Sequence, residues 1–101
     1  MYTYRVKVLN KVFLWGGAGI KVNLTEPLFL SCRVDEIGDP VDLSFVVMGA
    51  GALPHPPVPV AIGTLQQGET ITISLQGRSG IIAECAQGVH TYLTCAIHPS
   101  A

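Results

Sequence analysis

The sequence predicts an all-β fold: a single small antiparallel β-sandwich of about eight short strands, with a jelly-roll or an immunoglobulin-like strand order. Apolar and polar residues alternate in several segments, which is typical of strands that have one face on a core. Clusters of glycine, proline and acidic residues separate these segments at the short spacing of a sandwich or barrel. No long stretch of the 101 residues has helical periodicity.

The alternation is clearest in residues 2–9, 27–34, 41–48 and 69–76. In each segment one parity is apolar, and we expect that parity to face the core. The expected core positions are Tyr2, Tyr4, Val6, Val8, Leu28, Leu30, Cys32, Val34, Val41, Leu43, Phe45, Val47, Ile71, Ile73 and Leu75.

Turn signals lie at residues 16–19, 35–40, 77–80 and 87–89. The glycines of the first can supply the positive φ that a tight hairpin requires. We expect residues 81–86 and 90–97 to form a further hairpin, which directs Cys85 and Cys95 toward the core.

Residues 1–101 are expected to form one domain, with a Gly/Ala/Pro-rich apolar arm or loop at residues 48–63. The arm lies within a stretch without charged side chains, from Leu43 to Gly68. That stretch is long enough to cross a bilayer, but its prolines break any helix, so we expect no membrane partner. The prolines also exclude a central strand and favour an extended segment at the edge of a sheet. The pattern leaves open whether the arm packs on its own domain or on a neighbour.

Charged residues are scarce, and this composition favours association. They make up 13% of the chain, against roughly 25% in a typical soluble domain, and the formal net charge is −1. Large neutral patches on a monomer usually mark interaction surfaces. We therefore expect protein partners: further copies in a homo-oligomer, the subunits of a capsid shell, or both. The basic residues are dispersed, which argues against nucleic acid.

The three cysteines do not indicate a disulfide framework, because their number is odd. We expect them to be buried thiols. A zinc site built from Cys85, His90 and Cys95 lacks the close ligand pairs of structural zinc. We expect no metal and no cofactor.

No motif predicts catalysis, and we expect no catalytic residues. Ser79 lacks the strand–turn–helix setting of a nucleophile elbow and is interpreted as a turn residue. The glycine clusters at residues 16–21 and 49–52 lack the spacing and the following helix of a phosphate loop.

These observations favour a non-enzymatic structural or assembly protein. The profile of a short, charge-poor, all-β chain with no export signal resembles the cement (decoration) proteins of phage capsids. That resemblance implies a virion component that stabilises neighbouring subunits through apolar contacts; outside a virus we expect a cytoplasmic protein. The alternative is a carbohydrate- or small-ligand-binding sandwich module. The protein-interface candidates are Tyr2, Tyr4, Trp15, Met48, Leu53, Pro54, His55, Pro56, Pro57 and Val58.

Overall fold

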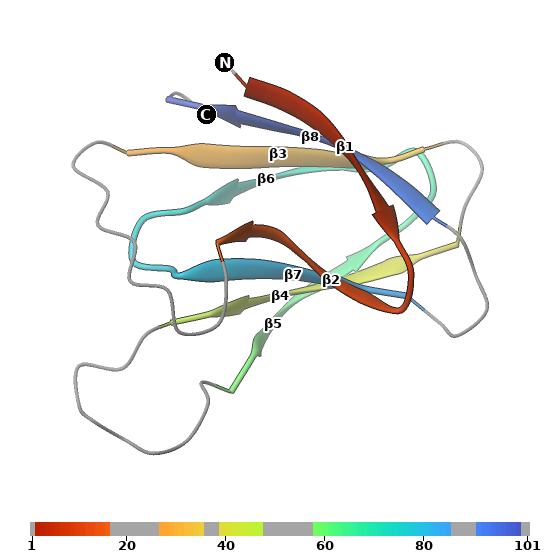
Figure 1. Cartoon of the computed structure of the whole chain (residues 1–101), viewed down its shortest axis with the longest axis horizontal. Helices are drawn as coiled ribbons and strands as arrows, with labels where there is room; N and C mark the ends of the chain where they lie inside the picture. Colours follow the sequence, from red (N-terminus) through yellow and green to blue (C-terminus); the bar gives the residue numbers. More distant parts are fainter. Residues whose placement is uncertain (1, 17–26, 36–38, 48–57, 86–90, 100–101) are drawn as a thin grey trace.

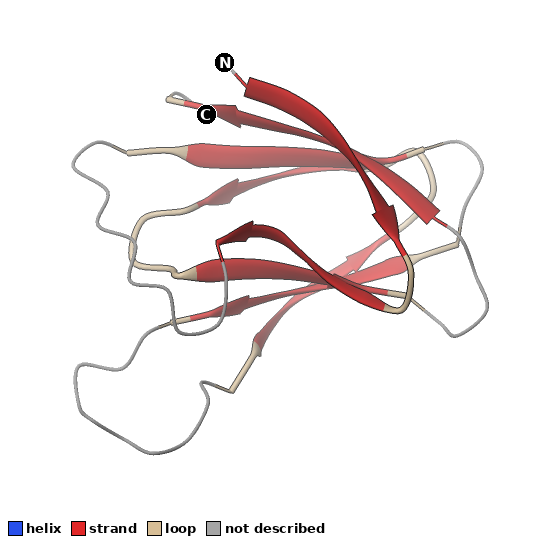
Figure 2. Cartoon of the chain, viewed as in Figure 1, coloured by secondary structure: helices blue, strands red, loops and turns tan. Residues whose placement is uncertain are grey.

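A computed structural model of the chain describes residues 2–16, 27–35, 39–47, 58–85 and 91–99. Within these residues the regular structure consists of strands (Figure 2), which confirms the all-β prediction. The strands are β1 (Tyr2–Val8), β2 (Lys11–Gly16), β3 (Phe29–Val34), β4 (Val41–Val46), β5 (Val60–Leu65), β6 (Thr70–Ser74), β7 (Gly80–Glu84) and β8 (Thr91–His98). No helical segment in the described ranges has the length and hydropathy needed to cross a bilayer.

The strands form two four-stranded antiparallel sheets, ordered β1-β8-β3-β6 and β2-β7-β4-β5. The sheets lie face to face as the two layers of a sandwich (Figure 1). Of the connections between consecutive strands, only that from β4 to β5 joins neighbours in one sheet. Every other connection passes to the opposite sheet, which is the arrangement of a jelly roll and not of an immunoglobulin domain.

The predicted hairpin between residues 81–86 and 90–97 is wrong. β7 pairs with β2 and β4, whereas β8 pairs with β1 and β3 in the other sheet. A turn signal indicates that the chain reverses, but it does not say whether the next strand pairs with the last one or crosses the core.

The core lies between the sheets, and most of the expected positions fill it. Its buried residues are Val8, Leu14, Leu30, Cys32, Val34, Val41, Leu43, Leu65, Ile73, Leu75, Ile81, Ala83, Cys85, Leu93 and Cys95. Tyr4, Val6, Leu28 and Ile71 pack against this cluster. The alternation therefore identified the inner faces of β3 and β6, and of β1 from Tyr4 onward; the core expectation for Tyr2 is wrong, because this residue at the start of an edge strand is 65% exposed.

The alternation fails in the second half of β4. Val46 is buried, and Val47, the residue that follows the strand, is 45% exposed. Phe45 is half-buried, under the guanidinium of Arg78 at 4.4 Å. The inserted residue of the β4–β5 ladder is Ile62 on β5, and β4 pairs with β7 without interruption up to Val46. The expectation for Val47 is wrong because this residue lies beyond the end of β4.

The predicted arm is partly a strand. Residues 48–57 lie outside the described residues, but residues 60–63 belong to β5. β5 is at the edge of its sheet, directly after Pro59, as expected for a proline-flanked segment.

Candidate interaction surface

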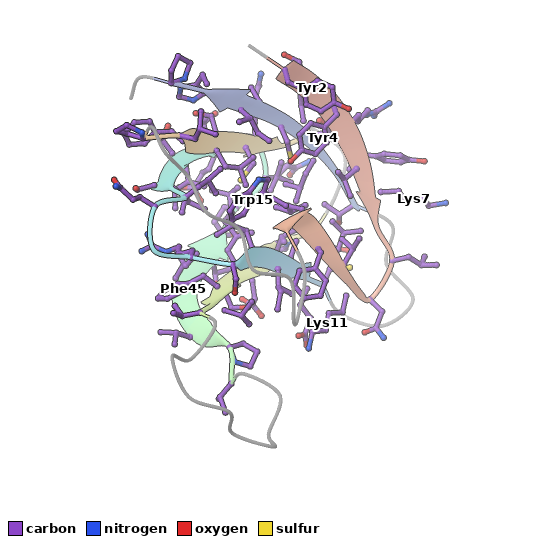
Figure 3. The ribbon with its side chains drawn as sticks, turned by 60° about the vertical axis from the view of Figure 1, so that its left-hand side comes forward. Tyr2, Tyr4, Lys7, Lys11, Trp15 and Phe45 are labelled. Carbon is purple, nitrogen blue, oxygen red and sulfur yellow. The ribbon has the colours of Figure 1, made fainter. Side chains whose placement is uncertain are left out.

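The aromatic interface candidates lie on the edge strands β1 and β2 (Figure 3). Tyr2 is 65% exposed, and its ring centroid is 5.3 Å from that of Tyr4. The Tyr4 hydroxyl donates a hydrogen bond to the carbonyl of Leu14 at 2.5 Å, which joins the two sheets at this side. Burial raises the pKa of Tyr4. Tyr4 and Trp15 pack against the core, so Tyr2 is the member of the group that is available to a partner.

Of the interface candidates in the arm, Val58 is the one that lies within the described residues. Met48, Leu53, Pro54, His55, Pro56 and Pro57 lie outside the described residues. Val58 is 80% exposed, and Val60 at the start of β5 is 50% exposed. Val60 is opposite Phe45 in the β4–β5 ladder, and Val47 and Val58 follow two residues beyond this pair on the two chain segments. We call Val47, Val58 and Val60 the β4–β5 apolar patch.

Sequence reasoning missed two members of this patch. It placed Val47 in the core, and it included Val60 in the arm but not among the interface candidates. Val47 is exposed because it lies beyond the end of β4, and Val60 is exposed because β5 is an edge strand. The signal for Val60 was present, since it follows the prolines of a segment already predicted to be an edge.

A hollow lies over β4 and β5. It has a volume of about 340 Å³ and is lined by Asp42, Leu43, Ser44, Pro59, Ala61, Gly63, Thr64 and Glu84. The Thr64 hydroxyl donates to the Asp42 carboxylate at 2.6 Å. None of these lining residues is aromatic, and Tyr2 and Trp15 belong to strands at the other side of the sandwich. The hollow does not have the composition of a sugar-binding site.

A serine–histidine contact lies on the outer face of the first sheet. The Ser31 hydroxyl is 2.7 Å from Nε2 of His98 and 2.9 Å from the hydroxyl of Thr72. Nucleophilic catalysis also needs donors for an oxyanion. The Asp35 amide donates to the Tyr92 carbonyl of β8. Residues along an antiparallel strand alternate between the two neighbouring strands, so the Ser31 amide, four residues before Asp35, also points to β8 and not to a bound oxyanion. We interpret these side chains as a row that ties β6, β3 and β8 together.

The cysteines are buried, and no disulfide joins them within the described residues. Cys32 lies directly opposite Cys95 on β3 and β8, an adjacency that the sequence reasoning did not find. Cys85 directly follows β7 of the other sheet, and its thiol donates to the Val8 carbonyl at 3.3 Å. Among the described residues no group of three or more His, Cys, Asp or Glu side chains has the arrangement of a metal site.

The paired thiols predict a loss of stability at alkaline pH. Burial raises the pKa of Cys32 from 9.0 to about 12 and that of Cys95 to about 11. Between pH 9 and about 11 the unfolded chain releases thiol protons that the folded chain retains, so the free energy of unfolding falls as the pH rises. Urea unfolding across this range measures the slope. The Cys32→Ala/Cys95→Ala variant is expected to have a smaller slope; an equal slope in both proteins would refute this cause.

No family model and no curated protein matches the chain. Among solved structures, the chain is similar to one described by the words "Bacillus endospore appendages form a novel family of disulfide-linked pili". The identity is 15%, the TM-score is 0.44, and the match covers 98% of this chain and 89% of the other. At this level the likeness carries no information on partners or activity.

Proposed function

We propose that the chain is a non-enzymatic structural protein that works as a repeated subunit held against neighbouring protein subunits. The observation that carries this proposal is the β4–β5 apolar patch. Its three valines are between 45% and 80% exposed, and they flank residues 48–57 in the charge-free stretch.

Burial of this patch supplies a driving force for association. Each Å² of apolar surface removed from water contributes roughly 25 cal/mol, and no charged group within residues 43–68 must be desolvated with it. Pro59 and the register shift in β5 oppose the addition of a strand at this edge. The patch therefore favours contact through side chains.

The setting that we propose is a virion, in which the protein cements neighbouring capsid subunits. The class resemblance described above supports this setting, and Tyr2 and Val58 are the described candidates for contact. Recovery of the protein with purified phage particles, and a gene beside that of a major capsid protein, are the expected findings. Particles that lack the protein would contradict the setting but not self-association.

The patch is tested with the variant Val58→Lys/Val60→Lys. We expect its self-association to be at least tenfold weaker than that of the wild type, because two charges are placed where apolar surface is buried. Sedimentation velocity over a range of concentrations measures the change.

The matched control is Thr3→Lys/Gln67→Lys, which adds the same charge at two exposed polar positions. It is expected to associate like the wild type. Equal behaviour of the two variants would contradict a role for the patch.

A further inference from the structure

Among the described residues, β6 is a sheet edge without the features that usually hinder strand addition. The sandwich has four edge strands, and three carry features that hinder the addition of another strand. β1 carries Arg5 and Lys7, β2 has a register shift after Phe13, and β5 follows Pro59 and has a shift of its own. β6, with the sequence TITIS, has no charge and no proline, and its register against β3 is continuous over all five residues.

The backbone of β6 directs hydrogen-bonding groups outward. The Leu75 amide donates to the Leu28 carbonyl at 2.9 Å, and the Val34 amide donates to the Glu69 carbonyl at 3.2 Å. Antiparallel ladders alternate between residues that bond the partner strand and residues that point away from it. Glu69 and Leu75 both bond β3, and the residues between them alternate in direction. The N–H and C=O groups of Thr70, Thr72 and Ser74 therefore point away from β3, to the free side of the strand.

The free side has little local cover among the described residues. The Ser74 carbonyl accepts a hydrogen bond from the guanidinium of Arg78 at 2.7 Å. A carbonyl oxygen has a second lone pair, so Ser74 can accept another bond. Thr70 and Thr72 are exposed, and β6 ends the sheet order at this side.

We propose that β6 pairs antiparallel with β6 of a second copy of this chain, around a twofold axis at Thr72. This inference rests on the proposed function and names the partner and the contact. In this register Thr72 lies opposite its own copy and Thr70 lies opposite Ser74 of the partner subunit. Outward residues then meet only outward residues, and each opposed pair exchanges two backbone hydrogen bonds.

The side chains of β6 are self-complementary in this register. On the outer face, each threonine or serine hydroxyl lies opposite another hydroxyl, and no like charges are opposed. Cross-strand pairs of hydroxyl side chains are stabilising. On the inner face, Ile71 lies opposite Ile73 of the partner subunit. Ile71 is half-buried at the margin of the core, and pairing covers it further. The contact uses the same surface on both copies, as a twofold dimer requires.

A charge-pattern experiment tests the register. Thr70→Lys/Ser74→Lys places Lys opposite Lys at both ends of the pairing, and we expect dimerisation at least tenfold weaker than that of the wild type. Thr70→Lys/Ser74→Glu places Lys opposite Glu, and we expect it to dimerise as tightly as the wild type or more tightly. Within one strand these positions are about 13 Å apart, so the difference between the variants arises between copies.

Sedimentation velocity measures the dimer dissociation constant, and circular dichroism verifies that both variants are folded. A wild type that stays monomeric overturns the proposed function together with this pairing. Association of the wild type and both variants to the same extent overturns only the pairing through β6. Equal weakening of both variants overturns the twofold register.

Discussion

Gly16→Ala is expected to lower the free energy of unfolding by about 3 kcal/mol or more. Gly16 has φ of +68°, and it lies opposite Gly80 at the end of the β2–β7 ladder. A Cβ built there would be 2.1 Å from the carbonyl oxygen of Ser79. That oxygen belongs to the backbone, so no rotamer change relieves the overlap, and the end of β2 must separate from β7.

Gly68→Ala is the matched control for backbone strain. Gly68 has φ of +77°, and a Cβ at that position would meet no atom within 4 Å. Its expected cost is that of the left-handed conformation alone, about 1 kcal/mol. Chemical denaturation of the two variants measures the difference, and a cost at Gly16 no greater than that at Gly68 would show that β2 does not approach β7 so closely.

Leu93→Ala is expected to cost about 3 to 5 kcal/mol, because it leaves a cavity at the centre of the core. Leu93 is fully buried on β8, where it lies opposite Val6 on one side and Val34 on the other. Since both neighbouring strands hold β8 in place, the core has little freedom to collapse into the space.

Leu9→Ala removes the same atoms from a side chain that is 58% exposed. Its expected effect is below about 0.5 kcal/mol. Thermal or urea unfolding of the pair gives the comparison directly. Similar costs at the two positions would contradict the packing described for the two sheets.

The sequence was sufficient to predict the inner faces of the regular strands. Leu30 and Ile73 are buried at positions that strict alternation predicts. Alternation holds only within a strand, and β4 ends at Val46 although apolar residues continue through Val47 and Met48 in the sequence. The exposed apolar patch therefore became visible only in three dimensions.

Strand order was the second property that the sequence left open. The turn residues predicted reversals of the chain, but neither Gly16 nor Gly80 indicates that consecutive strands lie in opposite sheets. The same limit applies to the interface candidates. Tyr4 and Trp15 have the amphipathic rings of interface residues, but both pack against the core and only Tyr2 is largely exposed.

The most direct test of an assembly role is sedimentation velocity of the wild-type chain from low micromolar to near-millimolar concentration. If copies of the chain associate through the β4–β5 apolar patch and through β6, the average mass rises with concentration above the 10.7 kDa of one chain. This rise is the result that we expect. A mass that stays at 10.7 kDa over the whole range would contradict the proposal that this protein works as a self-associating subunit.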